Sequence, residues 1–414
     1  MDQYGTALPM DGADLDFRDE LRTWLEENLV GDFAGQHDRG GPDDDDNWEL
    51  RRAWERKLGE GNWLGLSWPK RFGGREATLT QEILFAMEYA EAGAPPRAGF
   101  HGETLMAPTA LHYGTEEQKA RLLPPMATGG VVWCQGYSEP GAGSDLANIA
   151  TRAHLEDPST GSGQAAQWVI TGQKVWTTFA HHADWMFAIV RTEPGSTRHA
   201  GLSYILIPLD QPGVEVVPIR TMLGDSGFNE VFLDGARTSA DNVLGAPGEG
   251  WKAAMTTLGH ERATSVLNYQ FSFRREMAAL QALSRRKGAT EDPVIRDRLV
   301  DSLIGLEIMG YNNLRTLGSA LRNGEFGPEA SMGKYYWSRW HVQFTELAMD
   351  VLAEDGWLGT EWGSGPDRTS ESLRRAFVRA RAETIYAGTS EIQKNIISER
   401  VLGLPREPGP AKRG

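Results

Sequence analysis

The feature that most constrains the fold of this chain is a block of short β-rich runs between residues 131 and 240. The runs are VVWCQGYS, QWVITGQKVWTT, DWMFAIVRT, GLSYILIPL, VEVVPIR and NEVFLDG. Turn residues separate them, and each run is rich in the β-branched and aromatic residues that favour strands. No helical pattern is interleaved to make parallel crossovers, so the block predicts a small β domain with antiparallel pairing.

Helical periodicity dominates the sequence on both sides of this block. Phe17, Leu21 and Leu25 recur at helical spacing and predict an amphipathic helix over 14–30, which Gly31 ends. Further helices are expected at 47–59, 79–92, 115–128, 249–287, 293–322, 329–354, 370–384 and 390–402. The long helices after the β block have short connections, which is typical of a helical bundle.

The sequence thus predicts an α+β fold, mainly α, in three parts. We expect an N-terminal helical domain over 1–130, a middle antiparallel β domain over 131–241 and a C-terminal helical bundle over 242–414. The tail after Leu404 is rich in proline and glycine, and we expect it to be disordered.

Charge and cysteine content narrow the possible partners of the 414-residue chain. Its net charge of -15 argues against nucleic acid as the main partner, although a local patch can still bind an anion. Cys134 is the only cysteine, so neither an internal disulfide nor a thiolate metal cluster is expected. A reducing compartment fits this cysteine usage best.

Neither a targeting segment nor a membrane span is expected. The first thirty residues are too acidic for a signal or transit peptide. The apolar runs, such as 185–190, are far shorter than the roughly 18 residues of a membrane span. We therefore expect a soluble cytoplasmic protein.

Several common catalytic motifs are missing from the sequence. There is no GxGxxG opening a helix after a strand, no HExxH and no GxSxG, which argues against a Rossmann site, a zincin and a hydrolase elbow. His181 and His182 are adjacent, which is poor geometry for binding one metal ion, and we expect them at a surface or an interface. No metal site is predicted.

The segment from Trp133 to Asp145 reads WCQGYSEPGAGSD and carries the strongest sign of a ligand site. A short apolar run passes into Pro-Gly-Ala-Gly, which can neither continue a strand nor start a helix. Ser144 follows, beside backbone N–H groups that the glycines leave exposed. Such a loop can approach a flat or anionic ligand closely, although these residues alone are better explained by a surface turn.

Two later stretches give this loop a context. Residues 172–178 read GQKVWTT and residues 385–393 read IYAGTSEIQ. Together and in this order, the three stretches resemble the flavin-contacting segments of the acyl-CoA dehydrogenase family. The resemblance extends from GTEEQK at 114–119 to VLGLPR at 401–406, and it implies the same helical, β, helical order.

The resemblance implies FAD as the cofactor and assigns residues to it. A flavin needs an aromatic wall, donors to its ring carbonyls and a hydrogen bond near N5. By motif position, Tyr137 and Ser138 would meet the pyrimidine edge, Trp176 would back the ring and Thr178 would reach N5. The implied cofactor residues are Gln135, Tyr137, Ser138, Gly143, Ser144, Trp176, Thr178, Thr389 and Glu391. For Trp176 and Thr178 taken alone, ordinary strand propensity is a sufficient explanation.

The third motif has both a structural and a cofactor interpretation. Ser390 and Gln393 fit an S-x-x-Q capping box, which predicts the start of the last helix without any ligand. The resemblance adds contacts of Thr389 and Glu391 with the flavin nucleotide. The two roles are compatible, because a helix N-terminus is itself an anion site.

The catalytic base is where the sequence departs from the most common family pattern. Many members carry a glutamate directly before the Gly-Thr of the last motif, but here that position is Ala387. A second group of members places the base on the long helix after the β domain. The matching position is Glu261, followed by Arg262 in GHERATS.

The residues around Glu261 allow two interpretations. Trp251, Met255 and Leu258 mark one helical face, and Glu261 borders it, as a catalytic base or as an ion-pair partner of a neighbouring helix. Burial would raise the pKa of the carboxyl group, which suits a proton acceptor. Arg262 stays protonated and would orient the site. The implied substrate contacts are Ser144, Tyr386 and Arg262.

Two family segments that hold the adenosine half of the flavin across a subunit interface are not recognisable. FSFRRE at 271–276 replaces an arginine-phenylalanine-glycine segment, and LAEDGW at 352–357 replaces a glycine-rich one. These losses resemble the actinobacterial branch that acts on sterol and other bulky acyl-CoA substrates. Some enzymes of that branch are heterotetramers in which only one subunit type has a complete site.

The resemblance implies an FAD-dependent acyl-CoA dehydrogenase of fatty acid or sterol side-chain metabolism. Glu261 would remove the α-proton of the thioester while the β-hydrogen leaves as hydride to flavin N5, giving a 2,3-enoyl-CoA. An electron-transfer flavoprotein or similar acceptor would reoxidise the flavin. We expect a homo-oligomer, such as a tetramer, or a heterotetramer with a paralogous subunit. The alternatives are a non-catalytic or site-completing subunit of a heteromer, and a flavin oxidase or monooxygenase.

Overall fold

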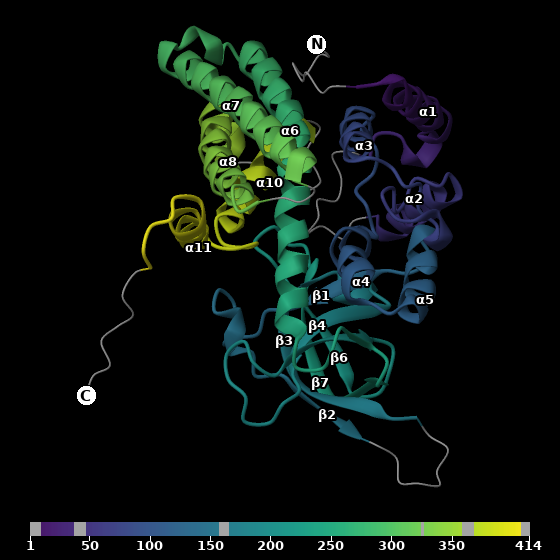
Figure 1. The fold of residues 1–414 in the computed structure, drawn as a ribbon. Coiled ribbons are helices and arrows are strands. Elements are labelled where there is room, and N and C mark those ends of the chain that lie inside the picture. Colours follow the sequence, from purple (N-terminus) through teal and green to yellow (C-terminus); the bar gives the residue numbers. More distant parts are fainter. Residues whose placement is uncertain (1–9, 37–46, 157–164, 324–326, 358–367, 407–414) are drawn as a thin grey trace, which may run out of the picture. The chain divides into compact units, whose positions relative to one another are not determined.

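The computed structural model describes residues 10–36, 47–156, 165–323, 327–357 and 368–406, apart from the side chains of 261–268, 321, 323, 357 and 368. The chain divides into two compact units, the first spanning Met10–Glu261 and the second containing the chain from Arg262 onward (Figure 1). Each unit is described by itself. The last residues of the expected disordered tail lie outside the described residues.

The first unit begins with helices. They are α1 (Gly12–Asn28), α2 (Trp48–Glu60), α3 (Leu79–Glu91), a π-helical turn (Gly102–Met106), α4 (Ala107–Tyr113) and α5 (Glu116–Ala127). Capping boxes at Asp11, Thr78 and Thr115 start α1, α3 and α5, because each side chain accepts the N–H of the third helical residue. The predicted helices are confirmed to within two residues at each end, while α4 was not expected.

An eight-stranded sheet follows the helices. Its strands are β1 (Trp133–Gly136), β2 (Arg152–Glu156), β3 (Gln167–Thr178), β4 (Trp185–Arg191), β5 (Leu202–Pro208), β6 (Val214–Ile219), β7 (Phe228–Ser239) and β8 (Val243–Leu244). The order is β6-β7-β3-β2-β4-β5-β8, with β1 paired to β4. Most pairs are antiparallel, but β1 and β2 both pair with β4 in parallel, so the all-antiparallel prediction is wrong there. The chain passes from β2 to its parallel neighbour β4 through β3, so a strand makes the connection for which the prediction required a helix.

Strand β4 shows how the sheet is buried on both faces. Phe187 and Ile189 pack into a cluster with apolar residues of α4 and α5. Met186 and Ala188, which alternate with them, pack instead against Ile170 and other residues of β3 and β7. Because successive side chains point to opposite faces of a strand, one short apolar run contributes to two cores.

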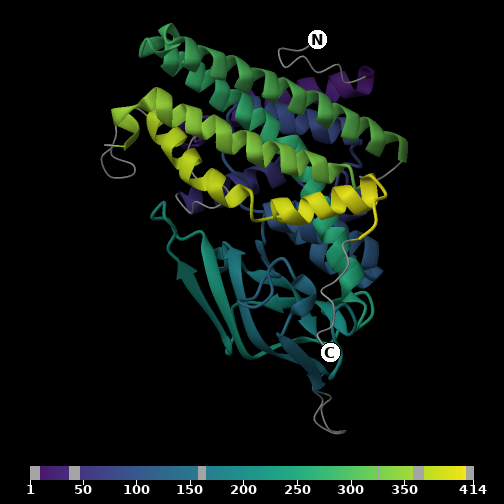
Figure 2. The same cartoon turned by 90° about the vertical axis from the view of Figure 1, so that its left-hand side faces the viewer.

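The second unit is a helical bundle. It contains the rest of α6 (Gly250–Arg286), then α7 (Pro293–Asn323), α8 (Ala330–Leu352), α9 (Glu354–Trp357), α10 (Arg368–Glu383), α11 (Ser390–Ile396) and a π-helical turn (Ile397–Val401) (Figure 2). Phe273, Trp337, Trp340 and Phe344 form the aromatic centre of its core. The long helices are confirmed, but the last α-helix ends at Ile396 rather than at 402. In the described part of the chain, no helix is long and apolar enough to cross a membrane.

Candidate active site

The loop after β1 doubles back on itself and is bonded to β3. Glu139 and Ala142 exchange two backbone hydrogen bonds of 3.0 Å each, which closes a tight turn. The Ser138 carbonyl accepts the N–H of Val175 at 2.9 Å, directly before Trp176. The structure therefore brings the first and second predicted flavin segments side by side within the first unit.

The glycines of this loop face open space. A Cβ added at Gly141 or Gly143 would meet nothing within 4 Å, whereas one added at Gly136 would lie 2.3 Å from the Met186 sulfur. Gly143 and Ser144 are exposed, and no hydrogen bond among the described residues uses their N–H groups. This face can therefore donate to a polar or anionic ligand without competition from the protein.

Trp176 has an unusual backbone conformation. The pairing of β3 with β7 is irregular between Lys174 and Thr177, and Trp176 lies within this bulge with φ of 59°. Regular alternation would place its ring on the buried side with Lys174, but the bulge leaves the side chain 59% exposed, edge-on to Phe228 at 5.9 Å. A bulky residue in the left-handed region is a costly outlier that is common at functional sites.

The other predicted residues of the first unit surround this corner. Gln135 on β1 and Thr178 at the end of β3 are half-buried, and the ring of Tyr137 is buried edge-on to Phe187 at 6.0 Å. Thr177 is fully buried and its carbonyl accepts the amide of Asn229 at 3.0 Å. An exposed aromatic wall, unused N–H donors and glycines facing open space fit the demands of a flavin.

Sequence reasoning missed two charged residues of the same corner. The ammonium group of Lys174 lies 2.8 Å from a carboxylate oxygen of Glu139, and both side chains are buried. The sequence does contain an indication of the buried lysine. Lys174 lies in phase with Trp168 and Ile170 on β3, so strand alternation places its side chain in the core. A buried lysine requires a partner of opposite charge.

The third motif lies in the second unit, and its cap differs from the prediction. Thr389, not Ser390, is the N-cap of α11: its hydroxyl accepts the N–H of Ile392 at 3.2 Å. The predicted capping box at Ser390 is therefore wrong. Ala387 and Gly388, directly before the helix, have left-handed backbone angles. The N-cap is therefore Thr389, one residue earlier than predicted. Ser390 is buried, and its N–H bonds to the carbonyl of Thr384 at 3.0 Å.

A charged cluster anchors the chain just before this motif. His341 of α8 lies between Glu383, at 2.7 Å, and Glu276, at 2.8 Å. Burial acts to lower the pKa of His341, but the two carboxylates outweigh it and raise the pKa to about 10, so the ring is charged. The Lys334 ammonium donates to the Glu383 carbonyl and lies 5.7 Å from the centre of the Tyr386 ring. Tyr386 is half-buried, while Glu391 is exposed.

The predicted catalytic residues Glu261 and Arg262 lie on α6, and their side chains are outside the described residues. The helix start is nevertheless firmly held. Trp251, Met255 and Leu258 pack against the core of the first unit, as the predicted apolar face requires. Thr257 is buried, and its hydroxyl lies 2.7 Å from that of Thr109 on α4.

His181 and His182 belong to the packing of the first unit. The ring of His182 stacks on Trp48 at 4.3 Å, and Nδ1 of His181 lies 2.9 Å from the side-chain oxygen of Asn229. Both residues are half-buried rather than freely exposed. These contacts tie the short turn after Thr178 to α2 and to β7.

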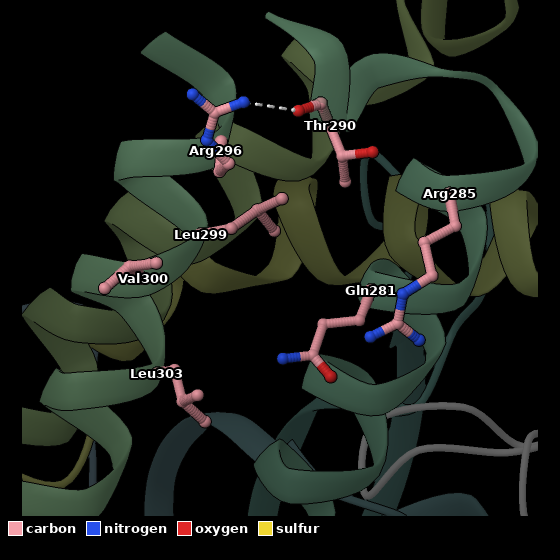
Figure 3. A pocket seen from close by; sticks show the side chains of 7 residues that line it. All are labelled: Gln281, Arg285, Thr290, Arg296, Leu299, Val300 and Leu303. Carbon is pink, nitrogen blue, oxygen red and sulfur yellow. Dashed lines mark hydrogen bonds between the residues drawn. The ribbon is translucent and has the colours of Figure 1, made fainter. Parts of the chain in front are cut away.

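A pocket of about 160 Å³ lies in the second unit, between the end of α6 and the start of α7 (Figure 3). Its lining combines polar and apolar side chains: Gln281, Arg285, Thr290, Arg296, Leu299, Val300 and Leu303. One guanidinium of this set, that of Arg296, already donates to the carbonyl of Thr290 at 3.2 Å. None of the predicted site residues lines the pocket.

Comparison with known families accounts for the whole architecture. The acyl-CoA dehydrogenase N-terminal domain matches residues 13–130, the middle domain matches 134–236 and the C-terminal domain matches 248–402. The chain belongs to the acyl-CoA dehydrogenase family. The helical, β, helical fold predicted from the resemblance is thereby confirmed.

Individual relatives agree with this assignment. The chain is 48% identical over 395 residues to the acyl-CoA dehydrogenase IpdE1 of Mycolicibacterium smegmatis, covering 95% of this chain and 98% of that protein. It is 46% identical over 394 residues to the acyl-CoA dehydrogenase IpdE1 of Mycobacterium tuberculosis, with the same coverage. The protein is accordingly an oxidoreductase of the acyl-CoA dehydrogenase type, from a family of flavoproteins.

Solved structures of similar fold include heteromeric complexes. The Tcur3481-Tcur3483 steroid ACAD has a TM-score of 0.82 at 29% identity, covering 97% of this chain and 100% of that chain. The ChsE4-ChsE5 complex from Mycobacterium tuberculosis has a TM-score of 0.78 at 27% identity, with the same coverage.

Proposed function

We propose that the protein binds FAD and catalyses the α,β-dehydrogenation of an acyl-CoA thioester to a 2,3-enoyl-CoA. The observation that carries this proposal is the corner of the first unit where the loop that contains Gly141 and Gly143 is hydrogen-bonded to β3, one residue before the exposed Trp176. Bound FAD would supply a hydride acceptor at its N5 atom.

The residues of this corner have separate roles in the proposal. Trp176 provides a flat apolar wall, and the N–H groups of Gly143 and Ser144 are donors for polar groups of the cofactor or the thioester. Thr178 and the loop residues Gln135, Tyr137 and Ser138 would orient the ring. In the second unit, Thr389 and Glu391 at the start of α11 would hold the nucleotide, and Tyr386 would contact the substrate.

We assign proton abstraction to Glu261. An α-proton becomes acidic enough to remove only when hydrogen bonds polarise the thioester carbonyl. The base and the hydride acceptor must therefore flank the Cα–Cβ bond from opposite faces. A methyl group at Ala387 cannot take the proton, and the resemblance to family members that carry the base on the helix after the β domain points to Glu261 on α6. Arg262, fixed in its charged form, would orient the substrate.

The substrate class proposed is a sterol-derived or similarly bulky acyl-CoA. This proposal rests on the similarity of the chain to a steroid ACAD of known structure, to which it is 29% identical. Reoxidation of the flavin would require an electron-transfer flavoprotein or similar acceptor.

The proposal includes a division of the chain into three domains at 1–130, 131–241 and 242–414.

Assembly into an oligomer is the second part of the proposal. An apolar stripe on the outer face of α7 is exposed within the second unit: Val300, Leu303, Ile304, Ile308 and Tyr311 are each between 38% and 67% exposed. The pocket of Figure 3 continues this stripe through Val300 and Leu303. Exposed apolar patches of this kind mark protein interfaces. A partner that covers the stripe would be a second copy or a paralogous subunit, as in the two-component complexes of similar fold.

An anaerobic absorbance titration tests the function. The purified chain is expected to show a flavin band that bleaches when one class of acyl-CoA is added. A colourless chain that gains flavin only when mixed with a paralogous subunit would favour the alternative of a site-completing subunit. Rapid reoxidation by air would instead favour a flavin oxidase or monooxygenase.

Replacement of the proposed base tests the mechanism. We expect Glu261→Gln to keep the flavin spectrum but to lower the rate of substrate-dependent bleaching by about a hundredfold or more, as for loss of a general base. Glu249→Gln is the matched control, because Glu249 is an exposed carboxylate just before α6 that pairs with Lys252. Full activity in Glu261→Gln would rule out the assignment.

A further inference from the structure

We propose that the buried Lys174–Glu139 ion pair is a positioning device that holds the loop at 137–145 against β3 in its flavin-binding conformation. This inference rests on the proposed function, because the ligand of the loop is the proposed FAD. Neither residue is assigned a contact with the cofactor. They act through the backbone that carries Gly143, Ser144 and Trp176.

Lys174 connects separate segments of the first unit. Its side chain is fully buried, and Nζ lies 2.8 Å from Glu139 Oε1 and 2.8 Å from the carbonyl oxygen of Ile189 on β4. A third, longer contact of 3.4 Å reaches the carbonyl oxygen of Tyr137. One cation therefore joins β3, β4 and the beginning of the loop.

Glu139 connects the loop to the chain that leaves it. One carboxylate oxygen accepts the N–H of Ala150 at 2.6 Å, and the other accepts the N–H of Thr151 at 3.0 Å as well as the Lys174 ammonium. The backbone of Glu139 simultaneously forms the tight turn with Ala142. Any displacement of this carboxylate would therefore move the turn that exposes the glycines.

The charges of the pair depend on each other. Burial lowers the pKa of Lys174, and the nearby carboxylate acts in the opposite direction. Burial alone would raise the pKa of Glu139, but the Lys174 ammonium and the N–H donors hold it below its ordinary value. Glu139 is therefore ionised at neutral pH and faces the cation directly.

The location of the pair indicates a role in geometry rather than in stability. A buried ion pair contributes little net stability compared with well-packed apolar residues, because two charges lose their hydration. Its directional bonds do, however, fix one arrangement of the groups that they join. Lys174 stands at the edge of the bulge, two residues before Trp176, so the pair sets both walls of the proposed flavin site.

The decisive variant removes both charges together. Lys174→Met with Glu139→Gln keeps the side-chain volumes, whereas either single change would leave a buried charge without its partner and endanger folding. The control is Arg22→Met with Glu88→Gln, which removes an ion pair of the first unit that has a buried carboxylate and a half-exposed guanidinium and lies far from this loop in the sequence. The full chain is used throughout, with its partner subunit where flavin binding requires one.

Two measurements separate the inference from the proposed function. Amide hydrogen exchange of the flavin-free chain is expected to accelerate by about tenfold or more at Ala142, Ala150 and Thr151 in the double variant only. FAD titration is expected to give a Kd weakened by about tenfold or more, again only in this variant, because the loop is no longer preorganised.

The outcomes are distinguishable. Exchange at these three amides that matches wild type overturns the positioning role, as does faster exchange with an unchanged Kd for FAD. A control variant with the same loss of flavin affinity overturns it as well, because the effect would then be general destabilisation. A wild-type chain that takes up no FAD under any condition counts against the proposed function, and the exchange rates alone then decide whether the pair positions the loop.

Discussion

Trp176 is held in a conformation that its own side chain disfavours. A tryptophan at φ of 59° lowers the free energy of unfolding by about 1–3 kcal/mol. Burial of the ring offsets little of this cost, because most of the residue is exposed. Two neighbours enforce the geometry: Val175 is bonded to Ser138, and Thr177 is buried and bonded to Asn229. The strain is consistent with an aromatic ring presented to a ligand.

Glycine at position 176 should therefore stabilise the flavin-free protein while harming its proposed function. We expect Trp176→Gly to raise the free energy of unfolding by about 1 kcal/mol, since glycine adopts left-handed angles without strain. The affinity for FAD should fall. Urea unfolding and FAD titration measure the two effects.

A glycine replacement at an ordinary strand position provides the control. Leu155 on β2 is 47% exposed, and Leu155→Gly should lower the free energy of unfolding by about 1 kcal/mol. Equal destabilisation by both replacements would contradict the argument from strain.

At the level of elements, His341 links three helices of the second unit through two ion pairs. Glu276 belongs to α6, His341 to α8 and Glu383 to α10, so a single charged ring joins them. In an unfolded chain the pKa of a histidine is about 6.5, whereas the pKa of His341 in the folded protein is about 10. Because the folded pKa is the higher one, the stabilisation is fully present below the unfolded value and is lost as pH rises through the folded value.

The pH dependence of unfolding tests this connection. We expect the free energy of unfolding of the wild type to fall as pH rises from about 7 to about 10. In Glu276→Gln one of the two carboxylates that raise the pKa of His341 is removed, so the fall in stability should be smaller and should end at a lower pH. Urea unfolding at a series of pH values provides the comparison, and an equally large fall in the free energy of unfolding of the two proteins between pH about 7 and about 10 would contradict the assignment.

The elements also show which parts of the fold could be read from the sequence. Helices with long apolar periodicity, such as α6 and α7, were predicted to within one residue at each end, because many positions favour the same face. The parallel pairing of β1 with β4 was not, because local patterns do not report which distant strand becomes a neighbour.

For the candidate site, motif resemblance identified the positions but not the local geometry. Trp176 and Thr389 were selected by their motifs, yet neither the left-handed angle of Trp176 nor the capping role of Thr389 follows from residue preferences. Lys174 was not among the predicted site residues. Its function depends on Glu139, whose distance from it is set by tertiary structure.

For the whole molecule, the exposed stripe on α7 predicts an assembly. We expect Ile304→Glu to shift the oligomer toward smaller species in sedimentation velocity, because a charge in the middle of an apolar interface loses its hydration on association. Val30→Glu, at a position that is 56% exposed after α1, should leave the distribution unchanged. A sedimentation profile of Ile304→Glu identical to that of the wild type would place the interface elsewhere.

The parallel pairing of β1 with β4 also has a consequence for the order of folding. β1 finds its partner β4 only after β2 and β3 have been made, so its contacts are distant in sequence and slow to form. On the ribosome, the glycine loop therefore emerges well before the strand that fixes its base. Binding of the proposed FAD at this loop would therefore have to wait until β4 has been synthesised.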